Sequence, residues 1–266
     1  MKLGVAHLNA LELAPEELVQ AAARAGFSAV GLRINPVAAG GICYPLKAGT
    51  EALLRIRTLL RSEGIGLNEV EFIELAPDTD ISRFAWMLEA GAELGATCVT
   101  VAGEDPDHGR LVANFAALCD LAAPFGLRVD VEFMAWRVIG TIRQAEALVV
   151  EAARPNGAIL VDALHLHRSG GTTADVRRLS PALVRAAQLC DAPADPPTTV
   201  AALVREARED RLPPGQGALP LAELLAALPA GTAFSAEVPM PGLAPSERLS
   251  VAYNATSALL GNAMGR

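Results

Sequence analysis

The sequence lacks the features that mark several large classes of protein. Its four cysteines form no Cys-x-x-Cys pair, which argues against a zinc knuckle or a disulfide framework. It has two lysines and no run of basic side chains, so the electrostatic footprint of a nucleic-acid-binding protein is missing. No apolar stretch reaches the roughly 18 residues of a membrane span. The start lacks the basic flank and long apolar core of a signal peptide, which predicts a cytoplasmic protein.

What the chain does have is a high apolar content, distributed in short segments. Hydrophobic residues make up 52% of its 266 residues, and the formal net charge is −8. Such a composition is typical of a folded protein with a large core. The length is also close to the roughly 250 residues of a single (β/α)8 barrel.

Short apolar segments alternate with helical segments along the chain. We predict strands over residues 2–7, 28–34, 65–72, 96–103, 127–133, 157–163, 183–190 and 232–238. We predict helices over 14–26, 47–63, 81–95, 109–125, 141–153, 199–210, 219–228 and 245–261, with a weaker one near 173–179. This alternation predicts an α/β fold, a TIM barrel of (β/α)8 type, as a single domain over residues 1–266. The Pro-rich stretch 192–200 is interpreted as a long active-site loop.

Oxygen-bearing side chains stand at the ends of four consecutive predicted strands: Glu132, Asp162, Gln188 and Glu237. A solvated strand end is the simpler interpretation of each one alone, but strand ends meet at the active-site mouth of this fold. Three carboxylates buried together repel one another, and a divalent cation relieves that repulsion. Oxygen ligands favour Mn²⁺ or Mg²⁺, with Co²⁺ an alternative, over structural zinc.

Other polar and aromatic residues follow the predicted strands. His165 lies three residues past Asp162 and is a candidate for orienting a ligand or transferring a proton. The candidates for binding substrate are His7, Arg33, Trp136, Arg137 and Arg168. The arginines would suit a carboxylate or phosphate group. Core packing and surface ion pairing are the alternative roles for these residues.

Several segments resemble the xylose isomerase-like TIM barrel superfamily, which includes sugar phosphate isomerases and epimerases. They are Val-Glu-Phe (131–133), Val-Asp-Ala-Leu-His (161–165), Ala-Gln-Leu-Cys-Asp (187–191) and Ala-Glu-Val (236–238), together with residues 21–33 and the Pro-Gly-x-Gly turn within 212–228. The resemblance implies that Glu132, Asp162, Gln188 and Glu237 bind the metal. It also implies that Glu132 and Glu237 are the catalytic proton-transfer pair, one on each face of the substrate.

Two chemistries within that superfamily compete. The first is a metal-dependent isomerase or epimerase of a sugar or hydroxy-ketone, acting by proton abstraction next to a metal-bound carbonyl. The alternative is a lyase similar to 3-dehydroshikimate dehydratases, which residues 131–149 and 187–193 resemble. The Gly-Arg-His cluster expected after Trp136 in that branch is absent, since Arg137, Val138 and Ile139 follow instead.

A non-catalytic binding barrel is a second alternative, because a fold alone does not fix a function. Either enzyme would act on a small-molecule substrate, and carbohydrate metabolism is the expected setting. The sequence leaves open whether the barrel forms a homo-oligomer.

Overall fold

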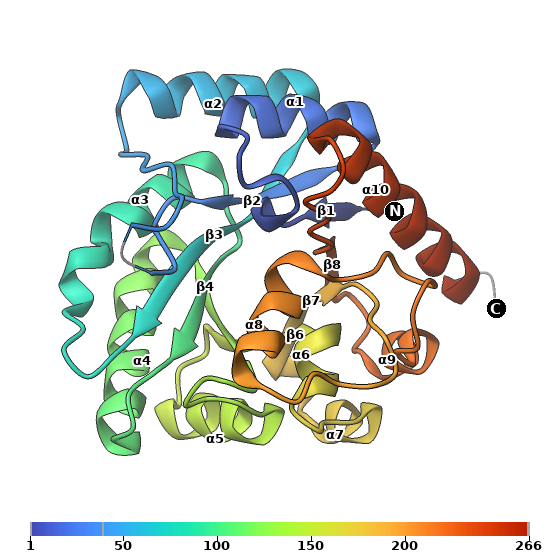
Figure 1. Cartoon of the computed structure of the whole chain (residues 1–266). Helices are drawn as coiled ribbons and strands as arrows, with labels where there is room; N and C mark the ends of the chain where they lie inside the picture. Colours follow the sequence, from blue (N-terminus) through green and yellow to red (C-terminus); the bar gives the residue numbers. More distant parts are fainter. Residues whose placement is uncertain (1, 39, 265–266) are drawn as a thin grey trace.

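The computed structural model describes residues 2–38 and 40–264, apart from the side chain of Met264. Within these ranges, eight parallel strands form a closed barrel in chain order, with β8 pairing to β1 (Figure 1). The strands are β1 (Leu3–Val5), β2 (Ala29–Arg33), β3 (Gly66–Leu75), β4 (Cys98–Gly103), β5 (Arg128–Glu132), β6 (Gly157–Asp162), β7 (Val184–Leu189) and β8 (Ala233–Ala236). The predicted TIM barrel is therefore confirmed.

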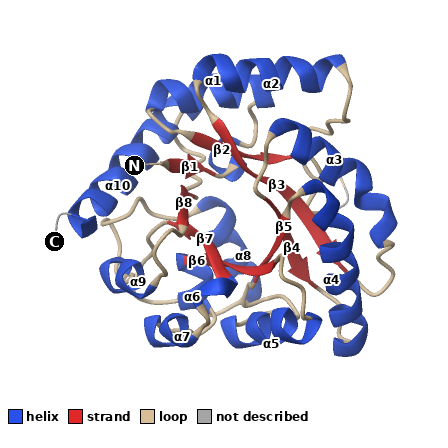
Figure 2. Ribbon diagram, turned by 180° about the vertical axis from the view of Figure 1, so that it is seen from behind, coloured by secondary structure: helices blue, strands red, loops and turns tan. Residues whose placement is uncertain are grey.

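Helices surround the barrel on the outside (Figure 2). The α-helices are α1 (Pro15–Ala25), α2 (Glu51–Glu63), α3 (Ala85–Leu94), α4 (His108–Ala122), α5 (Ile142–Ala152), α6 (Ala163–Arg168), α7 (Thr173–Arg178), α8 (Val200–Glu209), α9 (Leu221–Ala227) and α10 (Pro245–Met264). Short 3-10 helices are η1 (His7–Ala10), η2 (Ile81–Phe84), η3 (Ala123–Phe125) and η4 (Pro181–Leu183). In the part of the chain that the structure describes, none of the helices has the length and apolar character needed to cross a bilayer.

Helix α1 shows how the local sequence sets the bounds of an element. Pro15 occupies its first turn, where the missing amide hydrogen has no helical partner to lose. Gly26 ends the helix with a φ of 103°, a left-handed conformation that glycine adopts without a Cβ clash. Leu18 and Val19 are fully buried on the face toward the barrel. The core therefore lies between the ring of helices and the strands.

The connections after β6 and β7 depart from the sequence prediction. Strand β6 runs directly into the short helix α6, which the sequence did not predict. Asp162 caps that helix, because its Oδ1 accepts a hydrogen bond from the His165 amide at 2.9 Å. After β7, the sequence predicts an active-site loop over 192–200, but none of these residues is among those that line the cavity at the barrel mouth. The stretch leads into α8, and three residues at the C-terminal end of that helix, Ala207, Arg208 and Glu209, do line the cavity.

Candidate metal centre at the barrel mouth

The four predicted metal ligands lie together at the C-terminal ends of the strands. Glu132 ends β5, Asp162 ends β6, Gln188 lies in β7, and Glu237 follows β8. Asp162 and Gln188 are direct neighbours in the register of β6 and β7. Gln188 Nε2 donates to Glu237 Oε1 at 3.4 Å. All four side chains belong to residues that are at most 7% exposed, so the fold gathers three carboxyl groups and an amide in one buried cluster.

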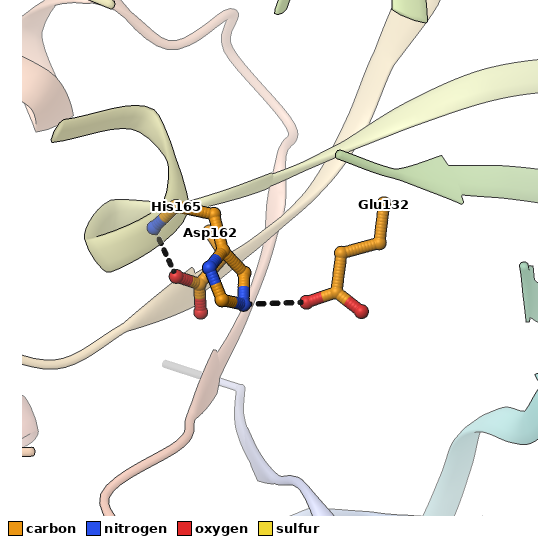
Figure 3. Close-up of side chains that lie close together, drawn as sticks. All are labelled: Glu132, Asp162 and His165. Atoms are coloured by element: carbon orange, nitrogen blue, oxygen red, sulfur yellow. Dashed lines mark hydrogen bonds and ion pairs between the residues drawn. The ribbon is translucent and has the colours of Figure 1, made fainter. Parts of the chain in front are cut away.

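His165 lies beside two of these carboxyl groups (Figure 3). One potential ligand atom from each of Glu132, Asp162 and His165 lies within 4.8 Å of the other two. The Nε2 atom of His165 is 3.5 Å from Glu132 Oε1. The ring meets Trp136 edge to face at 5.2 Å between centroids. Burial lowers the pKa of His165 to about 4, so a neutral imidazole faces the cluster.

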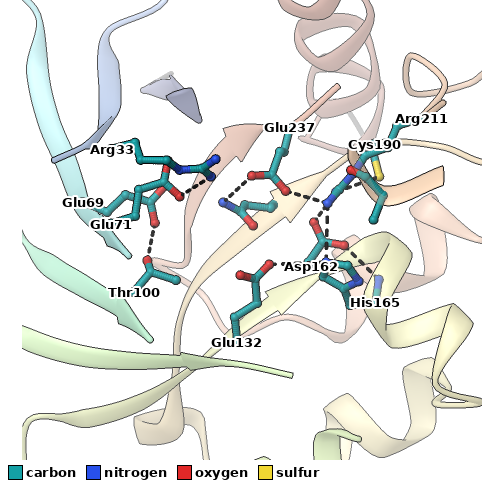
Figure 4. Close-up of polar contacts among 12 residues, drawn as sticks. Arg33, Glu69, Glu71, Thr100, Glu132, Asp162, His165, Cys190, Arg211 and Glu237 are labelled. Carbon is teal, nitrogen blue, oxygen red and sulfur yellow. Dashed lines mark hydrogen bonds and ion pairs between the residues drawn. The ribbon is translucent and has the colours of Figure 1, made fainter. Parts of the chain in front are cut away.

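Arg211, which the sequence analysis missed, lies in the same cluster (Figure 4). Its guanidinium donates from Nη1 to Asp162 Oδ2 at 2.6 Å and forms an ion pair through Nη2 with Glu237 Oε2 at 2.7 Å. Its Nε donates to the carbonyl of Ala207 at 2.7 Å. The side chain is 1% exposed. Arg211 therefore acts as an internal cation between two of the predicted ligands.

The segment after α8 folds back onto the end of β7, and this places Arg211. Asp191 forms an antiparallel bridge with Leu212. The Asp191 carboxylate also accepts from the amides of Gly215 and Leu219 at 2.9 and 3.0 Å. A Cβ at Gly217 would lie 2.4 Å from the carbonyl oxygen of Ala192, so the close approach requires glycine. The Pro-Pro-Gly-Gln-Gly turn over residues 213–217 is the sequence feature next to Arg211 that indicates a tight backbone return at this point.

The cluster carries more negative charge than Arg211 can balance. Three carboxylates and one guanidinium leave a net charge of −2 when all are ionised. Burial, followed by the charges of Glu237 and Asp162, raises the pKa of Glu132 well above its ordinary value. Burial also raises the pKa of Glu237 to about 7, against the opposing charge of Arg211.

The donor chemistry of the cluster fits a divalent cation. Such an ion would neutralise the two excess charges. The Oε1 atom of Gln188 is buried and has no hydrogen-bond partner among the described residues, so a free amide oxygen is also present. Carboxylate and amide oxygens are the ligands that Mg²⁺ and Mn²⁺ prefer.

A cavity of about 300 Å³ opens beside the cluster, at the small end of the range for small-molecule sites. It is lined by three of the predicted substrate-binding residues, Arg33, Trp136 and Arg137, and by Glu132, His165 and Glu237. Both arginines form ion pairs with carboxylates. Arg33 pairs with Glu71 at 3.2 Å, and Arg137 pairs with Glu74 and Glu104. The wall thus presents guanidinium groups whose positions are fixed by neighbouring carboxylates, of which Glu71 also lines the cavity.

The other two predicted substrate-binding residues have different surroundings. His7 is fully buried, where its Nδ1 accepts from the Arg33 amide at 2.9 Å and its Nε2 lies 3.0 Å from the Leu13 carbonyl. Arg168 donates to both carboxylate oxygens of Glu206 at 2.7 Å. His7 therefore supports the backbone that carries Arg33, and Arg168 joins α6 to α8.

Comparison with known proteins places the chain in a family. The family model for xylose isomerase-like TIM barrels matches residues 19–253. A 3-dehydroshikimate dehydratase of Pseudomonas aeruginosa is 31% identical over 146 residues, which are 54% of this chain and 22% of that protein, so the chain spans less than a quarter of this curated relative.

Two solved structures share the fold over almost the whole chain. The IOLI protein with a bound zinc atom has a TM-score of 0.81 at 20% identity and covers 98% of this chain and 99% of its own. A D-psicose 3-epimerase in the presence of D-fructose has a TM-score of 0.74 at 17% identity, with coverage of 97% and 98%. With the matched family model spanning most of its length, the chain belongs to the xylose isomerase-like TIM barrel family.

Proposed function

We propose that this protein is a divalent-metal-dependent lyase that removes water from an acidic β-hydroxy ketone of the 3-dehydroshikimate type. The observation that carries the proposal is the buried cluster of three carboxyl groups and one amide, which opens into a cavity whose lining includes Arg33 and Arg137. The partial likeness to a dehydratase points to the same reaction. The sequence alone favours an isomerase or epimerase, whereas this likeness together with the arginines of the cavity favours the dehydratase.

The cation would be held by Glu132, Asp162, Gln188 and Glu237, and its oxygen ligands favour Mn²⁺ or Mg²⁺. When bound there, a divalent cation polarises the substrate carbonyl and increases the acidity of the adjacent C–H bond. Arg211 holds Asp162 and Glu237 in place through its two ion pairs.

The remaining chemistry belongs to side chains that face the cavity. Glu132 and Glu237 both line it and are the candidates for accepting the proton from carbon. In a dehydration the C–H electrons form a carbon–carbon double bond while the bond to the β-hydroxyl breaks, and the hydroxyl leaves as water, which in the overall balance contains the proton taken from carbon. His165, wedged between Trp136 and Glu132, would orient that hydroxyl.

An isomerase or epimerase acting on a sugar or hydroxy-ketone is the second candidate. The observation in its favour is that two carboxyl groups, those of Glu132 and Glu237, line the same cavity. One could take a proton from carbon and the other could return a proton to a neighbouring atom or to the opposite face.

Activity assays separate the two candidates. Purified protein is incubated with 3-dehydroshikimate and Mn²⁺, and the absorbance of a conjugated product is followed in the near ultraviolet. We expect product that EDTA abolishes and added Mn²⁺ restores, and we expect Glu132→Gln to remove it. Metal-dependent exchange of tritium next to the carbonyl of a keto-sugar, with no conjugated product from 3-dehydroshikimate, would favour the isomerase instead. If metal-loaded protein shows neither the dehydratase activity nor the tritium exchange, both candidates are rejected.

A further inference from the structure

Helix α8 carries Arg208 into the cavity wall. Glu206 and Ala207 are its buried residues, and the double hydrogen bond from Arg168 fixes Glu206 in place. Arg168 also donates to the carbonyl of Pro193 at 2.8 Å, which joins the loop before α8 to the same anchor. Arg208, one residue after Ala207, lines the cavity from this fixed helix.

Arg208 differs in its partners from the other arginines of the cavity. Arg33, Arg137 and Arg211 each pair with at least one carboxylate. For Arg208, no carboxylate of the described ranges 2–38 and 40–264 lies within ion-pair distance. The adjacent carboxylate of Glu209 lies instead 3.9 Å from Arg205.

Two other guanidinium groups of the cavity, those of Arg33 and Arg137, also act on Arg208. Partial burial of this exposed residue lowers its pKa from the ordinary value, and the charges of Arg137 and Arg33 lower it further, against the opposing charge of Glu209. Arg33 and Arg137 already have carboxylate partners, so an anion that enters the cavity would find Arg208 as the guanidinium without one among the described residues. A carboxylate would bring one negative charge, which balances the one unpaired guanidinium, whereas a phosphate would bring close to two.

We propose that Arg208 is a specificity-determining residue that binds the carboxylate of an acidic substrate in this cavity. The planar guanidinium can donate two parallel hydrogen bonds to a carboxylate, a geometry that a hydroxyl of a neutral sugar cannot match. The proposal rests on the proposed function for the position of the reacting part of the substrate. It adds which group of the substrate Arg208 recognises.

Binding without turnover tests this role independently of catalysis. The probes are shikimate and its methyl ester, which share the ring and hydroxyls and lack the ketone on which the reaction depends. Isothermal titration of the Mn²⁺-loaded protein measures the two dissociation constants. We expect the acid to bind about tenfold or more tightly than the ester, the scale of a charge-assisted hydrogen-bond pair. Arg208→Met should weaken binding of the acid to the level of the ester and leave the ester unchanged.

A matched variant on the same helix controls for net charge. Arg205 is exposed, as Arg208 is, but it lies outside the cavity lining and pairs with Asp210 at 2.9 Å, so Arg205→Met should leave the acid-to-ester ratio unchanged. Equal affinity for acid and ester in the wild-type protein, no binding of the acid, or equal losses in both variants would overturn the proposal. Tighter binding of ribulose 5-phosphate than of shikimate, lost in Arg208→Met, would overturn its carboxylate specificity.

The same measurements separate this proposal from the proposed function. An intact acid-to-ester ratio that depends on Arg208, in a protein without dehydratase activity, rejects the dehydratase and supports the anion site. Dehydratase activity in a protein that binds acid and ester alike rejects the role of Arg208 and leaves the reaction standing.

Discussion

Replacing Arg211 with methionine should make the stability of the barrel depend strongly on metal. The substitution leaves Asp162 and Glu237 buried without their cation, and breaking a buried pair in this way costs about 3–5 kcal/mol. For a chain of this size, 1 kcal/mol changes Tm by about 2–4 °C. We therefore expect Arg211→Met to lower Tm in EDTA by about 6–20 °C. In saturating Mn²⁺ the deficit should shrink, because the cation would neutralise the same carboxylates.

Thermal unfolding with and without metal measures both values, and Arg168→Met supplies the control. The Arg168–Glu206 pair is similarly buried and has a similar length, but it lies outside the carboxylate cluster. Its loss should lower Tm equally in EDTA and in Mn²⁺. Isothermal titration should also show tighter Mn²⁺ binding to Arg211→Met than to wild type, since a competing positive charge has been removed. If Arg211→Met loses the same Tm in both conditions, the shared-carboxylate reasoning is refuted.

Three further substitutions test separate parts of the structure. Burial and the charge of Glu71 raise the pKa of Glu69 from 4.5 to about 8, so the folded state holds a proton that the unfolded state releases. The free energy of unfolding should thus fall as pH rises from 4.5 to about 8, by up to about 1.4 kcal/mol per pH unit. Urea titrations at about pH 5.5 and about pH 7.5 measure this fall, and Glu69→Gln should lack the contribution of Glu69 to it. Gly217→Ala should destabilise the protein by about 1–3 kcal/mol in urea unfolding, because its Cβ would meet the Ala192 carbonyl; unchanged stability would contradict the tight turn. Gln188→Leu should weaken Mn²⁺ binding by roughly 10- to 100-fold or more in calorimetric titration, and unchanged affinity would remove Gln188 from the ligand set.

The strands could be predicted from the sequence because buried parallel strands are short, nearly continuous apolar segments. Residues 127–133 were predicted as a strand from their apolar content, and β5 covers Arg128–Glu132 with Val129 and Val131 fully buried. Helix α6 could not be predicted in the same way. Its six residues follow β6 without a break, and its start depends on the Asp162 carboxylate that caps it. A helix this short has too few residues for apolar periodicity to show.

In the candidate site, too, the residues at strand ends could be predicted from the sequence, whereas those on the segment after β7 could not. Glu132 and Asp162 could be placed at the mouth because strand ends define that position in the fold. Arg211 and Arg208 could not, since their positions depend on how the segment after β7 folds back onto the barrel. That return is fixed by Asp191, whose carboxylate binds amides of residues 215 and 219. Residue order does not reveal such contacts between a loop and a strand end.

A titration of the metal-free protein with Mn²⁺ tests the central claim most directly. The comparison is between wild type and Asp162→Asn, a change that keeps the size of the side chain and a good helix cap for α6 while removing one charge. We predict one Mn²⁺ per chain in wild type and binding weakened by roughly 100-fold or more in Asp162→Asn, since a charged ligand is lost. Absence of Mn²⁺ binding by wild type, or equal affinity in Asp162→Asn, would contradict a metal centre at this end of the barrel.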